Sequence, residues 1–349
     1  SGDFIEKAIE IAEKTRDVVI KGDSHYQAYA LDIRILSLLE QPQTIDINGN
    51  IASVDPLGAE NVGEHLESLY VHNVPQITNF DFFEQYRSLK RFTYYPLSGK
   101  RNLDDISGLR HVKHTLEYLQ LYTYGPDNHQ MDVLGELSLR ELHLHQFSPK
   151  PNYDFLIGLH DSLEDFILEV DPTVRKLHQL NGLKNPKKIW LEGCPLLDDV
   201  SFLGKEAYKK NLKKFTLMTD YKYDVDGFEE VGGGGDLGES PPVLDLSYLH
   251  KLEVLEELVL DNVHVRNYNF FKDALFNDTL EFLMLHNMDS RYIDELHGLT
   301  QLKRLNLWDT QVVDIESLRY TPWEQNMVEL ELWDTGFDSF SYIKKYEKL

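Results

Sequence analysis

Apolar residues recur along the chain in a short fixed pattern, which is clearest at residues 302–318, LKRLNLWDTQVVDIESL. Leu302, Leu305 and Leu307 stand at its first, fourth and sixth positions, and a second apolar group follows a turn-like Trp-Asp-Thr. The alternation from the third to the seventh position predicts a short strand, and the second apolar group predicts a return segment. The same pattern recurs at 255–262, 280–287 and 327–334.

Twelve copies of the pattern follow one another along the chain. Their first positions are Pro42, Leu66, Leu89, Leu116, Leu139, Leu163, Pro186, Leu212, Leu255, Leu280, Leu302 and Met327. All spacings but one lie between 22 and 27 residues, and the exception is 43. That repeat contains a stretch rich in glycine, proline and acidic residues at about 221–243, which is typical of an inserted loop.

The second half of the repeat also recurs, as an acidic residue before a short apolar arm. Examples are LDDISGL (103–109), LDDVSFL (197–203), YIDELHGL (292–299) and VVDIESL (312–318). A carboxylate there favours a helix-like turn, because it lies near free backbone N–H groups. Together the two halves resemble the short leucine-rich repeats of cytosolic phosphatase-regulator-like proteins and of bacterial internalins. Over residues 42–349 the resemblance implies an α/β leucine-rich-repeat solenoid of about 12 repeats, with a curved parallel sheet on its concave face.

The ninth position of the repeat departs from this family's pattern. It is usually Asn or Cys, whose side chain satisfies backbone groups in the turn. Only Asn50 and Cys194 match. We therefore expect an irregular array with uneven curvature.

Residues 1–41 precede the repeats, and their apolar spacing predicts two helices. Phe4, Ile5, Ala8, Ile9 and Ala12 suit the first, and the second runs from about residue 26 to residue 39, before Pro42. Because the first strand of a stack leaves an edge and a core open, we interpret residues 1–41 as a helical N-terminal cap. A small helical module that binds a partner is the alternative.

Positions 3, 5 and 7 of each strand point away from the leucines, so stacked repeats place them together on the concave face. Three of the four tryptophans fall at these positions, although solvent alone disfavours large aromatic rings. Such rings are enriched in the centres of protein interfaces. We expect His286, Trp308 and Trp333 to form a stripe, beside an acidic rim of Asn287, Asp309 and Asp334. The predicted partner-binding residues are Tyr70, His72, Tyr95, Tyr118, Tyr122, His143, His145, Trp190, Met218, Met284, His286, Trp308, Asp309, Trp333 and Asp334. The alternative is that these aromatic residues only pack on one another and shield the sheet.

Composition narrows the choice of partner. The chain has 349 residues and a formal net charge of −24, which disfavours nucleic acid or an anionic membrane as the main partner. No apolar run is long enough to span a membrane. The single cysteine cannot form an internal disulfide, which favours a reducing, cytoplasmic compartment; a removed N-terminal leader stays an open alternative.

The sequence offers little chemistry for catalysis. His143 and His145, with Glu141 and Glu169, have a spacing that suits a metal, but in a chain with 14 histidines we interpret the pair as part of the binding face. Cys194 stands at the buried ninth position, and Gly232–Gly235 is followed by neither Lys-Ser nor a helical pattern, so neither a nucleophile nor a phosphate loop is expected. We predict no cofactor, metal or catalytic site.

These observations favour a non-catalytic scaffold that binds a protein or peptide with basic and apolar side chains. Two alternatives remain at this stage. One is the substrate-recognition or regulatory subunit of a ubiquitin ligase or phosphatase complex. The other is a microbial adhesion or carbohydrate-binding module, in which sugars stack on Trp308 and Trp333.

Overall fold

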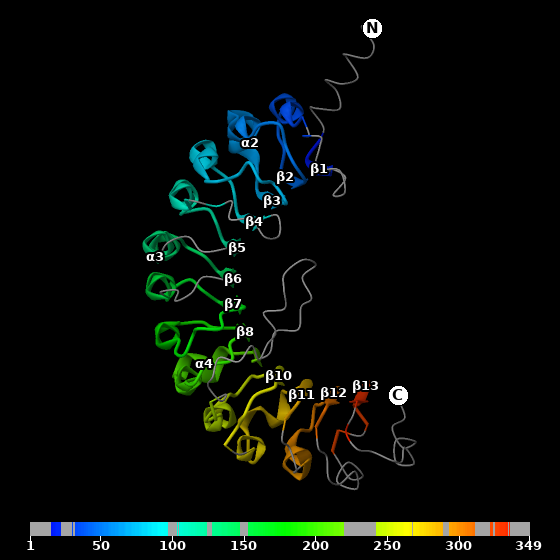
Figure 1. Cartoon of the computed structure of the whole chain (residues 1–349). Coiled ribbons are helices and arrows are strands. Elements are labelled where there is room, and N and C mark those ends of the chain that lie inside the picture. The colour runs from blue at the N-terminus through cyan, green and yellow to red at the C-terminus, as the bar shows by residue number, and fades with distance from the viewer. Residues whose placement is uncertain are drawn as a thin grey trace. The chain divides into compact units, whose positions relative to one another are not determined.

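The computed structural model describes most of the chain and groups it into two compact units. The described residues are 15–21, 30, 32–96, 103, 105–123, 128–146, 153–219, 242–266, 268–288, 293–310, 322–323, 325–333 and 335. The N-terminal unit holds the described residues up to Leu163, and the C-terminal unit holds those from Glu164 onward (Figure 1). The predicted insertion at 221–243 lies almost wholly outside the described residues.

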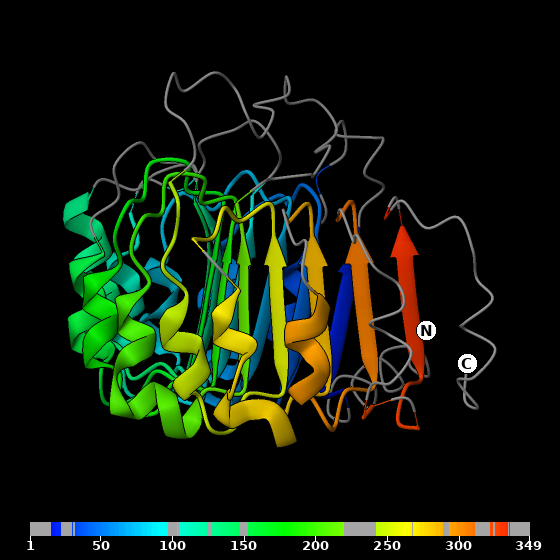
Figure 2. The same cartoon turned by 90° about the horizontal axis from the view of Figure 1, so that it is seen from below.

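Short parallel strands form the sheet in each unit, and within each unit every strand pairs with the next along the chain. The N-terminal unit holds β1 (Asp17–Lys21), β2 (Thr44–Asn48), β3 (Ser68–His72), β4 (Arg91–Tyr95), β5 (Tyr118–Thr123) and β6 (Glu141–Gln146). The C-terminal unit holds β7 (Asp165–Glu169), β8 (Lys188–Glu192), β9 (Lys214–Met218), β10 (Glu257–Asp261), β11 (Phe282–His286), β12 (Arg304–Trp308) and β13 (Glu329–Trp333). Figure 2 shows strands of the C-terminal unit side by side.

The twelve predicted repeats are confirmed residue by residue, because β2 to β13 each begin at the third position of one repeat. Paired strands match equal repeat positions, as in Ile45 opposite Leu69 and Leu283 opposite Leu305. The fourth and sixth positions of β2 to β12 are buried, as are the leucines at the first position. Removing these side chains from water supplies the main driving force for stacking.

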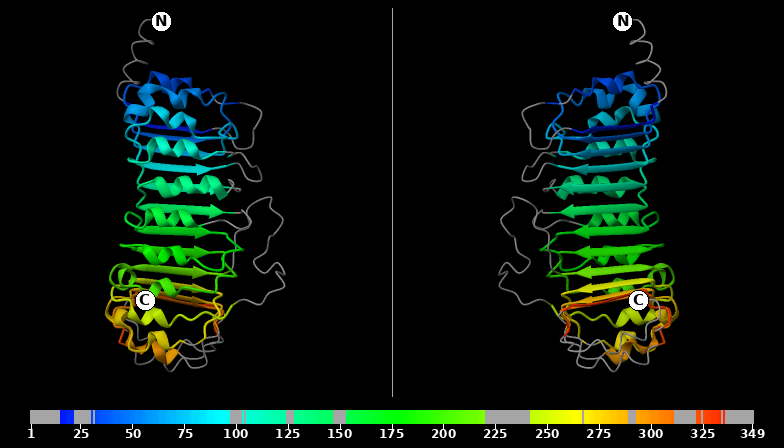
Figure 3. Two further views of the ribbon diagram at one scale, coloured as in Figure 1. Left: turned by 90° about the vertical axis from the view of Figure 1, so that its left-hand side faces the viewer. Right: turned by 90° about the vertical axis from the view of Figure 1, so that its right-hand side faces the viewer.

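Short helices, mostly of the 3-10 type, form the return segments on one face of the strands (Figures 1 and 3). Those of the described residues are η1 (Arg34–Leu38), η2 (Asp55–Gly58), α2 (Glu60–His65), η3 (Asp81–Gln85), η4 (Ser107–Val112), α3 (Asn128–Met131), η5 (Asp132–Glu136), η6 (Asp154–Leu159), η7 (His178–Gly182), η8 (Ser201–Gly204), α4 (Glu206–Asn211), η9 (Ser247–Lys251), η10 (Asn269–Phe271), η11 (Leu275–Asp278) and η12 (Ile293–Gly298). The helix-like turns expected at 103–109 and 197–203 are η4 and η8. Their acidic residues act as expected: Asp105 Oδ1 accepts the Ser107 N–H at 2.7 Å, and Asp199 Oδ1 accepts the Ser201 N–H at 2.8 Å.

The all-helical interpretation of residues 1–41 is wrong for residues 17–21. They form β1, which places Val18 opposite Ile45 and Ile20 opposite Ile47. The β-branched run Val18–Ile20 suits a strand. The first position of this additional repeat is Thr15, however, and because it is not apolar the repeat pattern does not predict the strand. Part of the second expected helix, Arg34–Leu38, is a 3-10 helix. The remaining cap residues, 1–14, 22–29 and 31, lie outside the described residues.

Asp171 performs the role expected of Asn or Cys at the ninth position, whereas the Thr310 hydroxyl has no hydrogen-bond partner among the described residues. Asp171 is fully buried, and its Oδ1 accepts N–H bonds from Thr173 at 2.9 Å and from Val174 at 3.1 Å. Thr310 is also fully buried. Residues of different types are therefore buried at the ninth position, which accounts for the irregularity of the sequence there.

Neighbouring return segments of the N-terminal unit approach so closely that glycine is required between them. A Cβ atom at Gly158 in η6 would overlap the carbonyl oxygen of Gly135 in η5, whereas a Cβ atom at Gly58 in η2 would stand 3.7 Å from Phe82 Cβ. Overpacking against backbone typically costs 1–3 kcal/mol. We therefore expect Gly158→Ala to lower the free energy of unfolding by about 2 kcal/mol in urea titration followed by far-UV circular dichroism. The control, Gly58→Ala, should leave it unchanged or slightly raised; equal losses in both variants would contradict the close approach.

Candidate functional site

The predicted binding residues on the described strands lie on the face of the sheet opposite the return helices, here called the open face, and Asp309 lies in the turn after β12. Strand pairing aligns the seventh positions into rows within each unit. Most of these side chains are half-buried by their neighbours, His145 and His286 are buried, and Asp309 and Trp333 are exposed. Asp334 lies outside the described residues.

In the N-terminal unit the seventh positions form a continuous row of rings, here called the aromatic row: His72, Tyr95, Tyr122 and His145. Ring centroids are 6.3 Å apart for His72 and Tyr95, and 4.5 Å apart for Tyr95 and Tyr122. Tyr122 stacks on His145 at 4.7 Å with an interplanar angle of 23°. His143 also contacts Tyr122, at 5.6 Å. The rings of this row therefore cover one another.

Polar groups beside the aromatic row are joined in a hydrogen-bond network. Tyr118 Oη donates to Gln120 Oε1 at 2.9 Å, and Gln120 Nε2 donates to Tyr122 Oη at 3.3 Å. The Arg91 guanidinium lies over the Tyr118 ring, 3.9 Å from its centroid. Burial raises the pKa of Tyr118 above its ordinary value. In this part of the open face, the polar side chains therefore find most of their hydrogen-bond and charge partners within the chain itself.

His72, at one end of the aromatic row, makes the stability of the fold depend on pH. Burial lowers the pKa of His72 below its ordinary value of 6.5; nearby Lys21 lowers it further, and Asp46 partly opposes both. Above that value His72 is neutral in the folded and unfolded chain alike. As the pH falls below it, the unfolded chain takes up the proton more readily, so the folded state loses stability. We expect His72→Gln to reduce the loss of unfolding free energy between pH 8 and pH 5.5, measured by urea titration. An unchanged loss would contradict this role of His72.

In the C-terminal unit the seventh positions of β11, β12 and β13 form the tryptophan strip: His286, Trp308 and Trp333. Centroids of His286 and Trp308 are 5.7 Å apart in an edge-on arrangement, and those of Trp308 and Trp333 are 5.9 Å apart. Trp333 keeps 68% of its surface exposed. The predicted stripe is therefore present, and one of its rings faces solvent.

A buried carboxylate adjoins the strip. Asp261, at the seventh position of β10, is 2% exposed, and its Oδ1 lies 2.8 Å from His286 Nδ1. That distance suits an ion pair, although the imidazole is not aligned to donate a hydrogen bond to Oδ1.

Asn306 and Glu331 form a second row on the open face, at the fifth positions of β12 and β13. Asn306 Nδ2 donates to Glu331 Oε2 at 3.1 Å. Asn306 Oδ1 and Trp308 Nε1 are buried and have no hydrogen-bond partner among the described residues. The sequence places Asn306, Glu331 and Asp261 outward but does not single them out, because their burial and hydrogen bonds depend on side chains of the neighbouring strands.

Trp190 does not join the strip. It lies at the fifth position of β8, where its Nε1 donates to Glu192 Oε2 at 2.9 Å and Lys188 Nζ lies 5.1 Å from its ring centroid. Glu192 itself is only 6% exposed. Trp190 is therefore held by its own strand, and the three outward tryptophans do not form one group.

The rim beside the strip has a backbone explanation. Asn287 and Asp309, at the eighth position, take the left-handed conformation, with φ of 48° in each case. Asn and Asp tolerate this conformation better than most residues. Asn287 Nδ2 also donates to Asn262 Oδ1 at 2.7 Å. The strand-to-loop turn therefore selects these residues, whether or not a partner contacts them.

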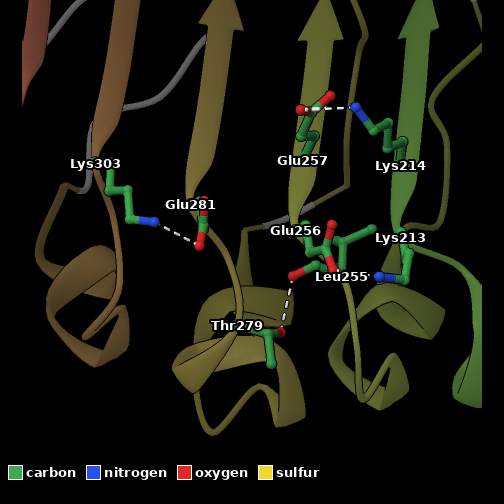
Figure 4. Close-up of polar contacts among 8 residues, drawn as sticks. All are labelled: Lys213, Lys214, Leu255, Glu256, Glu257, Thr279, Glu281 and Lys303. Atoms are coloured by element: carbon green, nitrogen blue, oxygen red, sulfur yellow. Dashed lines mark hydrogen bonds and ion pairs between the residues drawn. The ribbon is translucent and has the colours of Figure 1, made fainter.

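Ion pairs join neighbouring strands of the C-terminal unit at the edge where the strands begin (Figure 4). Lys214 Nζ lies 2.9 Å from Glu257 Oε1, and Lys303 Nζ lies 2.7 Å from Glu281 Oε1. Lys213 and Glu256 form a similar pair at 2.6 Å. Each such exposed pair typically contributes 0–1 kcal/mol. Their main consequence for the open face is that these lysines are already matched by carboxylates.

The groups considered for catalysis take structural positions. Within the described residues no group of three His, Cys, Asp or Glu side chains could hold a metal ion. His143 and His145 both pack on Tyr122. Cys194 is fully buried, its Sγ lies 3.5 Å from the Glu192 carbonyl oxygen, and burial raises the pKa of the thiol. A buried, protonated thiol is a poor nucleophile.

Comparison with known proteins identifies the fold. No protein-family model and no curated protein sequence matches the chain. An internalin of Listeria monocytogenes is similar in structure over 98% of this chain and 87% of its own, with 17% identity and a TM-score of 0.60. A leucine-rich-repeat protein of Leptospira interrogans covers 98% of this chain and 95% of its own, with 17% identity and a TM-score of 0.45.

The internalin likeness and the repeat-by-repeat strand register agree, so the chain folds as a leucine-rich-repeat solenoid. In the part of the chain that the structure describes, every helix is too short or too polar to cross a membrane.

Proposed function

We propose that this chain is a non-catalytic interaction scaffold that binds a protein or peptide partner on the open face of its C-terminal unit. The tryptophan strip supplies the anchors of this surface. Repeat solenoids commonly use such extended sheet faces for binding. The proposal concerns the site, because the fold alone does not specify a function.

The exposure of Trp333 beside Trp308 carries the proposal. A large ring that keeps 68% of its surface in water forgoes most of the free energy that burial would supply. Its neighbour at 5.9 Å extends the apolar surface across two strands. Trp is the residue most typical of the few positions that dominate interface energetics.

The N-terminal unit provides the contrast. In the aromatic row each ring contacts the next, and Gln120 bonds to the hydroxyls of Tyr122 in the row and of Tyr118 beside it. That arrangement fits the shielding role considered for all the outward aromatic residues. We therefore place binding on the tryptophan strip and assign the aromatic row mainly to stabilising the sheet.

The charge of the chain favours a basic partner. The net charge of −24 attracts cationic surfaces and repels phosphate backbones. Asp309 is exposed at the rim, and Glu331 lies on the open face beside the strip. A partner segment with apolar and basic side chains matches both the rings and these carboxylates.

Site-specific photocrosslinking tests this proposal without removing either tryptophan. A benzophenone amino acid at position 309 places the reactive group beside the strip, because the Asp309 N–H bonds to the Trp333 carbonyl at 2.8 Å. The same group at position 275, which is 56% exposed in η11 of the same unit, serves as the control. We expect one discrete covalent partner from position 309 and none from position 275. Adducts from position 275 alone, or equally from both, would place binding elsewhere.

A further inference from the structure

We propose that the open face of β12 and β13 binds an arginine side chain of the partner, at a subsite formed by Asn306, Trp308, Glu331 and Trp333. This inference rests on the proposed function and adds the residue that is recognised. The strand register places Asn306 opposite Glu331 and Trp308 opposite Trp333, so the four side chains form a block of two by two. Oxygen acceptors occupy one row of the block and indole rings the other.

The chain already places cations over outward aromatic rings at three places on its open face. Arg91 lies 3.9 Å from the Tyr118 centroid, Lys188 lies 5.1 Å from that of Trp190, and Arg304 lies 4.3 Å from that of Phe282. Among the described residues, no lysine or arginine lies over Trp308 or Trp333. The ring faces of Trp308 and Trp333 are therefore available to a cation from a partner. Such cation–π contacts most often use arginine as the cation, and tryptophan is the ring that binds it best.

The neighbouring cations are engaged elsewhere. Lys303 pairs with Glu281 at 2.7 Å, and Arg304, besides covering Phe282, lies 3.8 Å from Glu257. Within the described residues, the carboxylate of Glu331 accepts one hydrogen bond, from the neutral donor Asn306 Nδ2. The carboxylate in the block therefore lacks a counter-charge from the described residues beside it.

Two buried polar atoms in the block specify arginine within a peptide. Asn306 is 8% exposed, and among the described residues its Oδ1 has no donor and Trp308 Nε1 has no acceptor. Unmatched buried polar atoms are costly, so a ligand that supplies their partners gains affinity. A guanidinium offers several N–H donors in one plane, enough for Asn306 Oδ1 and Glu331 together, and it stacks on a ring. The backbone carbonyl of the same peptide supplies the acceptor for Trp308 Nε1. The compact ammonium group of lysine cannot combine stacking with two planar hydrogen bonds in this way.

Fluorine NMR of the intact chain, labelled with 5-fluorotryptophan, tests the subsite. The four resonances, from Trp190, Trp308, Trp323 and Trp333, are assigned by replacing each with phenylalanine in turn. The probes are capped nine-residue peptides of glycine and leucine with a central arginine, lysine or citrulline. We expect the arginine peptide to shift Trp308 and Trp333 saturably and to leave Trp190 and the fully buried Trp323 unchanged. Citrulline, which keeps the shape without the charge, and lysine should each bind about three- to fivefold more weakly.

Variants of the block separate this inference from the proposed function. Glu331→Gln should weaken binding of the arginine peptide about three- to fivefold through loss of the ion pair, whereas Glu329→Gln, two residues earlier on β13, should not. Equal binding of the three peptides, with shifts confined to Trp308 and Trp333, would overturn arginine recognition and leave the strip as a binding surface. If none of the peptides shifts either resonance, the inference fails, and so does peptide binding by the strip. Insensitivity to Glu331→Gln would also overturn the subsite.

Discussion

Replacing Trp308 and Trp333 together by alanine is expected to cause the largest loss of partner binding. Truncating an aromatic residue at the centre of an interface typically costs about 2 kcal/mol or more, which is about 30-fold in affinity. The two rings are 5.9 Å apart and share neighbours, so their effects should couple rather than add simply. A combined loss between about 30-fold and 1000-fold is expected by calorimetry or biolayer interferometry, with the partner recovered by crosslinking.

The fold should survive this double substitution, because both side chains lie on the open face. Far-UV circular dichroism and the urea midpoint should therefore stay close to those of the parent chain. Leu275→Ala is the matched control, since Leu275 is an exposed apolar residue of the same unit that lies outside the strip. Unchanged binding in the double variant, or its unfolding, would show that the strip was assigned wrongly.

Phe80→Ala is expected to cause the largest loss of stability in the N-terminal unit, about 3–5 kcal/mol. Phe80 is fully buried, and its ring meets Phe92 at 5.0 Å, Tyr94 at 5.5 Å and Phe83 at 5.7 Å between centroids. Deleting the ring leaves a cavity between β4 and η3, which the surrounding strand and helix cannot easily close.

The measurement for Phe80→Ala is a chemical denaturation curve followed by far-UV circular dichroism. Tryptophan fluorescence is unsuitable, because all four tryptophans lie after residue 163, in the sequence of the C-terminal unit. Ile157→Ala, at a residue that is 56% exposed, should change the free energy of unfolding by no more than about 0.5 kcal/mol. A similar loss in the two variants would contradict the idea that the Phe80 cluster is the core of this unit.

The two units use outward aromatic residues differently. The rings of the aromatic row contact one another in succession, and Tyr122 Oη accepts a hydrogen bond from Gln120, so the row reinforces the sheet that carries it. The tryptophan strip ends on a ring that is mostly exposed, and it adjoins polar atoms that have no hydrogen-bond partner among the residues the structure describes. The same repeat pattern thus supports two kinds of surface: one whose side chains contact and hydrogen-bond one another, and one suited to binding a ligand.

Sequence reasoning alone determined the repeat register from residue 42 onward, and with it the strands and the residues of each face. It could do so because alternation along a strand and leucine at fixed positions are local properties, which each repeat shows again. The repeat pattern did not predict strand β1, because its first position is Thr15 and it contains no leucine at the pattern positions.

Only the tertiary structure decided which outward residues act together. Trp190 and Trp333 look alike in sequence, yet Trp190 bonds to Glu192 and lies beneath Lys188, while Trp333 stays open to solvent. The pairing of Asn306 with Glu331 likewise joins residues from different repeats. The physical reason is that exposure, ring stacking and hydrogen-bond satisfaction depend on neighbours about 25 residues away, and these meet only when the strands pair.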